Sequence, residues 1–265
     1  KANVVCETQQ YDLGNFEHVE IMPIADLHLG DPSMDESLLY EVAEWLNKKP
    51  NRYTVIAGDV FNAGLKDSVS SVYNESMTLQ EAIDEFKRWV KILGKDKIIS
   101  VVRGNHDNRV VKSVGLDALA VACELAEIPY SGPEGYITPS VGDWKSRKKR
   151  TPIKYLMFLT HGTGGGRTAG SKINGVMRHT GIVVADIYVQ GHAHTPTITP
   201  GMVYTTDPRC ERIIDRDQLF VITPSFIHRD GYAKDYAFAP VSRKFPVIKL
   251  SGERKSLEAE LKDLS

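Results

Sequence analysis

The fold is first indicated by residues 19–30, which read VEIMPIADLHLG. The apolar run at residues 19–25 predicts a buried strand. Asp26 and His28 follow directly after it. In an open α/β sheet, side chains just beyond the strand ends form the binding site. A single Asp or His at a strand end is more often a cap or a turn residue, so this segment is informative only together with others.

Four later segments repeat the arrangement, with predicted strands at residues 53–57, 98–102, 155–159 and 187–189. The polar motifs that follow these strands are Gly58-Asp59, Gly104-Asn105-His106-Asp107, Thr160-His161-Gly162 and Gly191-His192-Ala193-His194. Because the strand ends of an α/β sheet line up along one edge, we expect the five motifs to converge on one site. Gly58-Asp59 alone is almost uninformative, but a chance origin of the whole ordered set is a poor explanation.

Helical segments lie between the first strands and predict an α/β core. Capping boxes at Ser33-x-x-Glu36 and Thr78-x-x-Glu81 predict two helices, and residues 115–127 form a third. We expect a loop at residues 130–150 and a short helix near residues 173–178. The last quarter predicts strands at 202–205, 219–223 and 247–250, with a terminal hairpin through Ser251-Gly252. No linker divides the chain, so we expect one domain over residues 1–265.

The composition is that of an ordinary globular protein, with 42% hydrophobic and 25% charged residues among 265. The net charge of −1 argues against tight electrostatic binding of duplex nucleic acid. The basic run from Lys145 to Arg150 is interpreted as a solvated loop, with contact to a nucleic-acid backbone as the alternative.

We expect a cytoplasmic protein without membrane contact. The three cysteines match no disulfide framework or zinc motif. The apolar runs are too short to span a bilayer, and the first residues lack the core of a signal peptide.

The converging motifs offer donors of the kind that divalent metals prefer. The candidate ligands are Asp26, His28, Asp59, Asn105, His161, His192 and His194. A mixed set of oxygen and imidazole donors suits Mn, Fe or Zn better than Ca or Cu(I). Two divalent ions need about this many ligands and a carboxylate to bridge them.

The ordered motifs resemble the calcineurin-like metallophosphoesterase family, whose pattern Asp-x-His, Gly-Asp, Gly-Asn-His-(Asp/Glu), His, Gly-His-x-His is present from Asp26 to His194. The resemblance implies a four-layer αββα sandwich of two mixed sheets with a two-metal site. By this resemblance, Asp26, His28 and His194 would bind one ion. Asn105, His161 and His192 would bind the other, with Asp59 bridging the two.

The resemblance also implies a reaction. A hydroxide that bridges the metals would attack phosphorus, with His106 assisting the leaving group. Asp107 would either orient His106 or cap the following turn. Manganese is the first choice for both ions, with Fe, Zn, Ni or Mg as alternatives. Arg109, Gly165 and Arg167 are the candidate substrate contacts.

Departures from the protein-phosphatase pattern favour a phosphodiesterase that acts on nucleic acid or nucleotides. Asn62 and Ala63 stand where those phosphatases have an Asp and a phosphate-binding Arg. The motif at residues 26–30 is similar to the SbcD-type nuclease branch, and the chain is similar to small phage-encoded members of the family. The alternatives are a phosphomonoesterase on a small metabolite or protein, and a non-catalytic binding protein of the same fold. The oligomeric state is left open.

Overall fold

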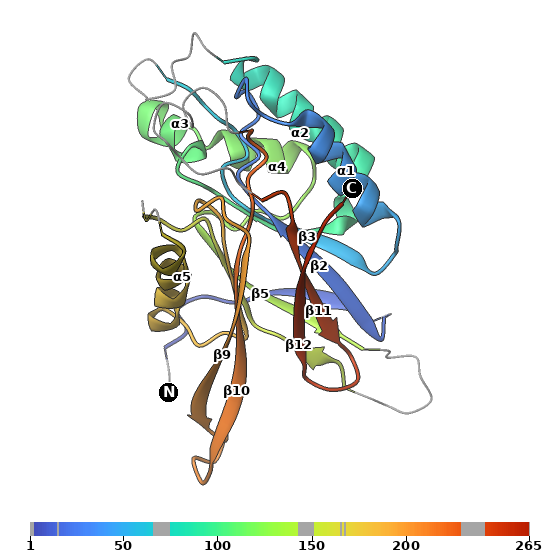
Figure 1. Ribbon diagram of the computed structural model, residues 1–265, viewed down its shortest axis with the longest axis vertical. Coiled ribbons are helices and arrows are strands. Elements are labelled where there is room, and N and C mark those ends of the chain that lie inside the picture. Colours follow the sequence, from blue (N-terminus) through green and yellow to red (C-terminus); the bar gives the residue numbers. More distant parts are fainter. Residues whose placement is uncertain are drawn as a thin grey trace.

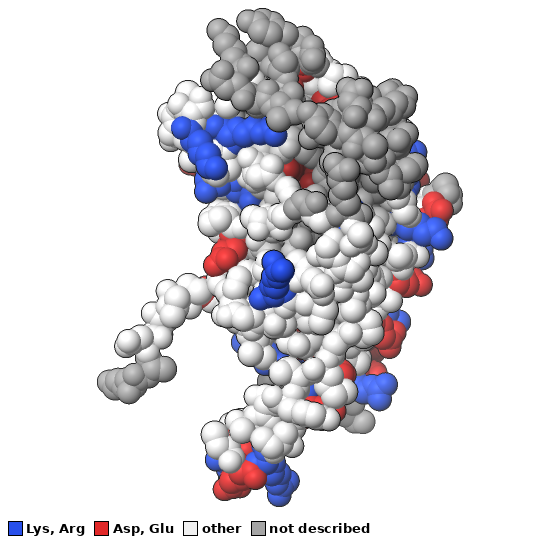
Figure 2. Space-filling view, turned by 60° about the vertical axis from the view of Figure 1, so that its left-hand side comes forward, with Lys and Arg blue, Asp and Glu red and all other residues white. Residues whose placement is uncertain are grey.

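The computed structural model describes residues 3–14, 16–65, 75–142, 151–164, 166, 168–228 and 242–264. It is a mixed α/β fold in which two mixed sheets stack face to face with helices outside each (Figure 1). This confirms the four-layer αββα expectation. Both signs of charge are interspersed on the described part of the face in Figure 2, as the near-zero net charge suggests.

The five-stranded sheet has the order β12-β11-β2-β3-β4. Its strands are β2 (His18–Ile24), β3 (Arg52–Ala57), β4 (Ile98–Val102), β11 (Phe245–Ser251) and β12 (Leu257–Lys262). The first three are parallel, so their carboxyl ends meet at one edge. Strands β11 and β12 pair antiparallel, which confirms the predicted terminal hairpin.

The seven-stranded sheet has the order β1-β5-β7-β8-β10-β9, and the short β6 pairs with β5. Its strands are β1 (Gln9–Leu13), β5 (Glu134–Val141), β6 (Ile153–Lys154), β7 (Met157–Thr160), β8 (Ile187–Gln190), β9 (Thr197–Thr206) and β10 (Ile213–Ile222). Parallel pairing of β7 and β8 brings their carboxyl ends together as well.

The helices form the outer layers. They are α1 (Glu36–Asn47), α2 (Leu79–Leu93), α3 (Asp107–Val114), α4 (Ala118–Leu125) and α5 (Ala169–Met177), with 3-10 turns at Lys95–Lys97 and Arg178–Gly181. One apolar cluster joins α1, α2 and α4 to the five-stranded sheet, a second lies between the sheets, and a third joins α5 to the seven-stranded sheet. The sheet edges that carry the motifs are therefore held in a rigid, packed frame.

Two helix predictions require correction. Helix α1 is capped by Asp35, whose Oδ1 accepts the amide of Leu38 at 3.1 Å, and not by Ser33. The capping box at Thr78 is confirmed. The helix expected at residues 115–127 is shorter because Asp117 caps it at Ala118.

The predicted loop at residues 130–150 is wrong over β5, and residues 143–150 lie outside the described part. Gly135 and Pro139 are residues that disfavour strands, so the sequence of this segment resembles a loop. Pairing with β1 on one side and β7 on the other stabilises the strand. Strand β1 and helix α3 were also not predicted.

Within the described residues, no helix is both long and apolar enough to cross a membrane. All three cysteines are free thiols: Cys6 and Cys210 are exposed, and Cys123 is buried.

Candidate metal centre

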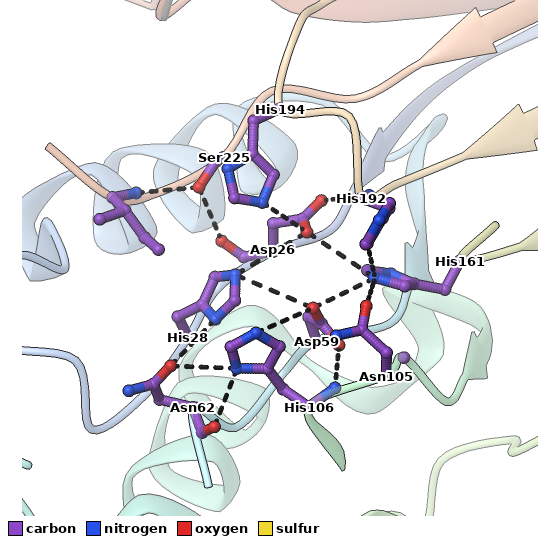
Figure 3. A network of polar contacts seen from close by, with 12 residues as sticks. Asp26, His28, Asp59, Asn62, Asn105, His106, His161, His192, His194 and Ser225 are labelled. Atoms are coloured by element: carbon purple, nitrogen blue, oxygen red, sulfur yellow. Dashed lines mark hydrogen bonds and ion pairs between the residues drawn. The ribbon is translucent and has the colours of Figure 1, made fainter. Parts of the chain in front are cut away.

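The five strand-end motifs meet at one place between the two sheets, as predicted (Figure 3). They follow β2, β3, β4, β7 and β8. Asp26, Asp59, His28 and His161 are at most 3% exposed. A buried carboxylate is costly unless it is paired or binds a cation. The site therefore holds buried carboxylates and imidazoles that need hydrogen-bond partners or a bound cation.

The loops adopt unusual backbone geometry to deliver these side chains. Asp26, His28, Asp59, His192 and His194 all have left-handed φ values of 50° to 63°. Such values are uncommon for residues other than glycine, and they cluster at functional sites where surrounding structure enforces them. Here the amides of Asp26 and His28 donate to the carbonyls of Gly58 and Asp59 at 2.9 and 3.0 Å. The first two motif loops thus hold each other in place.

Two motif glycines are required by close approach of these loops. A Cβ on Gly58 would lie 2.6 Å from the amide nitrogen of Gly104, and a Cβ on Gly104 would lie 2.0 Å from Asp59 Oδ1. No side chain fits at either position without moving the loops apart. The glycines therefore set the distance between the Asp59 and Asn105 loops.

One group of donors consists of Asp26, His28 and His194, whose ligand atoms lie within 4.8 Å of one another. His194 Nε2 is 2.9 Å from Asp26 Oδ1, and His28 Nε2 is 3.8 Å from the same oxygen. The other oxygen of Asp26 accepts the amide of His192 at 2.9 Å. This group matches the set expected for one ion.

A second group consists of Asp59, His161 and His192, also within 4.8 Å. His161 Nε2 lies 3.1 Å from Asp59 Oδ2 and 3.0 Å from Asn105 Oδ1. Asp59 Oδ2 is also 4.0 Å from His28 Nε2, which belongs to the first group. Asp59 therefore stands between the two groups, where a bridging ligand is expected.

The chemistry of the donors fits divalent cations. His28 Nε2 is buried and has no hydrogen-bond partner in the described part of the chain. Its Nδ1–H donates to Asn62 Oδ1 at 3.3 Å, so the lone pair of Nε2 faces the carboxylates. His161 is similar, since its Nδ1–H donates to the carbonyl of Ala57 at 2.7 Å. Hydrogen bonding at the second nitrogen is the usual support of a metal-binding histidine.

The electrostatics show a site that attracts positive charge. Burial opposes protonation of His161, but the carboxylates of Asp59 and Asp26 outweigh it and raise the pKa of His161 to about 9. Burial likewise opposes ionisation of Asp59, yet the neighbouring imidazoles hold the pKa of Asp59 well below its usual range. Burial and the nearby imidazole of His106 lower the pKa of His28 to about 3. A cation bound here would take the place of the proton on His161.

Asn62 has a role at this site that the sequence analysis missed. Its carbonyl oxygen accepts the Nδ1–H of His106 at 2.9 Å, and its side-chain oxygen lies 3.1 Å from the same nitrogen. His106 Nε2 accepts from Arg109 Nη2 at 3.0 Å and lies 4.0 Å from Asp59 Oδ2. Asn62 therefore contacts both His28 and His106, and it orients His106 toward the metal groups (Figure 3).

Glu75 holds the Asn62 side chain in turn. Its Oε1 accepts from Asn62 Nδ2 at 2.8 Å, which directs the amide oxygen toward the two imidazoles. Burial raises the pKa of Glu75 to about 7, against the lowering effect of the Asn62 hydrogen bond. The only sequence signal for this contact was the departure of Asn62 from the phosphatase pattern, and nothing marked Glu75.

Asp107 does not orient His106 in this structure. Its buried carboxylate accepts the amides of Phe61 and Gly104, each at 2.9 Å, and so ties the loop after β3 to the loop after β4. Burial and the nearby Asp59 raise the pKa of Asp107 to about 7. Neither expected role of Asp107 is seen in these contacts: its partners are a neighbouring loop and the preceding Gly104, not the turn that follows, and the ring of His106 is held by Asn62 and Arg109.

The candidate substrate contacts differ in outcome. Arg109 lies beside His106 and also donates to the Asn62 carbonyl at 3.2 Å. Gly165 and Arg167 lie outside the described residues, as does the basic run from Lys145 to Arg150.

The family model described as calcineurin-like phosphoesterase matches residues 20–196. The chain therefore belongs to this family of metallophosphoesterases, and it is a metal-dependent phosphoesterase with a phosphate-ester substrate. No curated protein matches the sequence significantly.

Solved structures resemble the chain at low sequence identity. A metallophosphoesterase from Sphaerobacter thermophilus is 12% identical with a TM-score of 0.43, covering 92% of this chain and 89% of that one. A predicted phosphoesterase from Streptococcus pneumoniae is 13% identical with a TM-score of 0.37, covering 93% and 99%. A hypothetical protein from Pyrococcus horikoshii is 11% identical with a TM-score of 0.42, covering 92% and 87%.

Proposed function

We propose that the protein is a dinuclear phosphodiesterase that hydrolyses nucleic acid or nucleotides. The observation that carries the proposal is the pair of donor groups joined through Asp59, with His106 and Arg109 beside them. Asp26, His28 and His194 would hold one ion, and Asn105, His161 and His192 the other. When bound, the ions would lower the pKa of water and polarise the phosphoryl oxygens.

The chain's own residues contribute binding and proton transfer. His106 is anchored at Nδ1 by Asn62, so Nε2 is the atom that would face the leaving oxygen. Only the ring protonated on both nitrogens, with Nε2–H no longer accepting from Arg109, would pass that proton to the leaving group. Arg109 lies next to that nitrogen and would balance negative charge that develops on the phosphoryl group. Asn62 and Glu75 would act as positioning residues, because they touch the imidazoles and not the reacting atoms.

The small number of positively charged side chains beside His106 in the described part of the chain favours a phosphodiester substrate over a phosphomonoester. A phosphodiester carries one negative charge, whereas a monoester carries up to two near neutral pH. Ala63 stands where protein phosphatases have a phosphate-binding guanidinium. Among the described residues, Arg109 is the arginine placed beside His106. The similarity of residues 26–30 to the SbcD-type nucleases points the same way.

One activity panel tests the proposal. Protein loaded with Mn²⁺, and in parallel with Mg²⁺, Zn²⁺ or Ni²⁺, is assayed on bis-p-nitrophenyl phosphate, p-nitrophenyl phosphate, cyclic nucleotides, and single- and double-stranded DNA and RNA. We expect kcat/KM for diesters to exceed that for the monoester by at least about tenfold, which is about 1.4 kcal/mol.

The variant His106→Ala tests whether this site carries the activity. It should keep its metal content but lose activity by about 10²- to 10⁴-fold. Cleavage of the monoester with no activity on diesters or oligonucleotides would refute the diesterase and leave a phosphomonoesterase. Activity that is absent, or unchanged in His106→Ala, would refute the role given to this site.

A further inference from the structure

His194 depends on its own loop more than His28 or His161 does. Its side chain is 33% exposed, whereas the side chains of His28 and His161 are each 3% exposed. The rings of His28 and His161 are also fixed through hydrogen bonds at Nδ1. Within the described residues, the ring of His194 has one hydrogen bond, from Nε2 to Asp26 (Figure 3). The backbone on either side of His194 must therefore set most of its position.

This backbone is held in an uncommon conformation. His194 has a left-handed φ of 51°, which residues other than glycine adopt where the surrounding structure enforces it. The hydroxyl of Thr195 donates to the carbonyl of Ala193 at 3.1 Å, so the two neighbours of His194 are in contact. A single neutral hydrogen bond contributes little net stability, so this loop needs a further support.

Lys172 of helix α5 supplies that support. Its Nζ donates to the carbonyl of Ala193 at 2.8 Å and to the hydroxyl oxygen of Thr195. The ammonium therefore binds the residue before His194 and the residue after it. Hydrogen bonds from a charged donor are about twice as strong as neutral ones. Because the carbonyl of Ala193 shares a peptide plane with the amide of His194, fixing this carbonyl fixes the backbone from which the imidazole extends.

Helix α5 is a firm base for this contact, since it packs on the outer face of the seven-stranded sheet (Figure 1). Val176 is buried in one apolar cluster with Phe158, Tyr188 and Phe220 of that sheet. Residues four apart lie on the same face of a helix, so Lys172 shares the sheet-facing side with Val176. The lysine therefore links a packed outer helix to the loop that carries His194.

We propose that Lys172 is a positioning residue that holds His194 in place for its metal ion. The inference rests on the proposed function, in which Asp26, His28 and His194 hold one ion. His192, on the same loop, has separate support, because its amide donates to Asp26 Oδ2 at 2.9 Å. Loss of the Lys172 ammonium should therefore weaken the ion held by His194 more than the other ion.

The other role open to this ammonium is direct contact with the substrate phosphate. Lys172 is only partly exposed, and two acceptors of the chain already bind its Nζ, which favours the positioning role. The two roles differ in what they change. A positioning residue acts on metal affinity, whereas a substrate contact acts on KM and leaves metal affinity unchanged.

Titration of the metal-free full chain with Mn²⁺ measures both metal affinities without an activity assay. Lys172→Met keeps the length of the side chain and removes the ammonium, and the affinity for one ion should fall by about 10- to 100-fold. The affinity for the other ion should stay within about threefold of the wild type. Lys172→Arg retains a charged donor, so both affinities should stay within about threefold.

Assays on bis-p-nitrophenyl phosphate then separate positioning from substrate binding. At limiting Mn²⁺, kcat of Lys172→Met should fall by about tenfold, and excess Mn²⁺ should restore it. KM should stay within about threefold of the wild type, because Lys172 does not touch the substrate.

Lys91→Met, at an exposed position of helix α2, is the control and should change neither metal affinity nor activity. Circular dichroism should show that all variants are folded. Unchanged affinity for both ions in Lys172→Met, or a raised KM with unchanged affinity, would overturn the proposal. An affinity as weak in Lys172→Arg as in Lys172→Met would also overturn it. A wild type that binds two ions but cleaves no phosphodiester would refute the proposed function and leave this inference standing.

Discussion

The two halves of the metal centre support their histidines in different ways. His28, in the first group, donates its Nδ1–H to the side chain of Asn62, which Glu75 holds in turn. His161, in the second group, donates its Nδ1–H to the backbone carbonyl of Ala57 at the end of β3. The orientation of His28 therefore depends on the side chains at positions 62 and 75, and the orientation of His161 depends on the backbone of β3.

This difference shows which half a substitution can change. A backbone carbonyl remains whatever the residue at position 57, so the orientation of His161 is built into the fold. The orientation of His28 can be removed by one substitution at Asn62. The same amide also contacts His106, so the first donor group and the histidine proposed as the proton donor are linked through one side chain. Substitutions at Asp59, Asn62 and Glu75 therefore test whether the two donor groups depend on different supporting residues.

The largest effect is expected for Asp59→Asn, which weakens both halves at once. An amide offers one oxygen and no negative charge, so it is a poor bridge between two cations. We expect kcat/KM to fall by at least about 10³-fold, or about 4 kcal/mol, with less than two bound metal ions per chain. Assays with Mn²⁺ and elemental analysis measure both quantities.

The control for Asp59→Asn is Asp84→Asn, an exposed carboxylate in helix α2. It should change neither activity nor metal content. Full metal content and activity in Asp59→Asn would contradict the bridging role.

Asn62→Ala should affect the first half selectively. It leaves the Nδ1–H of His28 without its partner, whereas the ring of His106 loses only the side-chain contact and keeps the backbone carbonyl of residue 62. Loss of such a supporting contact typically weakens metal binding about 10- to 100-fold, and kcat should fall by a similar factor. Metal titration should then show one weakened site and one unchanged site. Equal weakening of both sites would contradict the separation of the halves.

Glu75→Ala should have a smaller effect of the same kind. Asn62 keeps its place but loses the acceptor that directs its amide, which is worth about 1.4 kcal/mol or about tenfold in kcat. Glu75→Gln retains an acceptor oxygen and should remain within about threefold of the wild type. KM should change little in both variants, because neither residue touches substrate.

Glu41→Ala, at an exposed position of α1, is the control and should be neutral. An equal loss of kcat in Glu75→Ala and Glu75→Gln would contradict the positioning role.

The smallest expected effect is on the free energy of unfolding, which should depend on pH through Glu75. Burial raises the pKa of Glu75 from 4.5 to about 7, so the folded state disfavours its ionised form. The wild type therefore loses stability, relative to Glu75→Gln, as pH rises from about 4.5 through 7. Because Glu75 is partly solvated, we expect a gap of about 1 kcal/mol at pH 8 and almost none below pH 4.5. Urea unfolding with EDTA measures this gap, and a gap independent of pH would contradict the assignment.

The sequence predicted the strands that deliver the metal-centre residues because each is an apolar run that ends abruptly in polar residues. It also predicted which histidines and carboxylates converge, since parallel strands share an edge. It failed at β5, where Gly135 and Pro139 resemble loop residues although the strand lies between two partners. It also failed at Asn62 and Glu75, which come together through the fold and share no motif.

The order of the motifs, and with it the family and the donor set, was determined by the sequence alone, because residue type and spacing encode strand ends and ligand chemistry. The tertiary structure alone decided which side chains orient those donors. It placed the Asn62 amide between two imidazoles and directed Asp107 to the backbone of the neighbouring loop. Such contacts depend on distances of a few ångströms between segments far apart in the chain, and no local pattern records them.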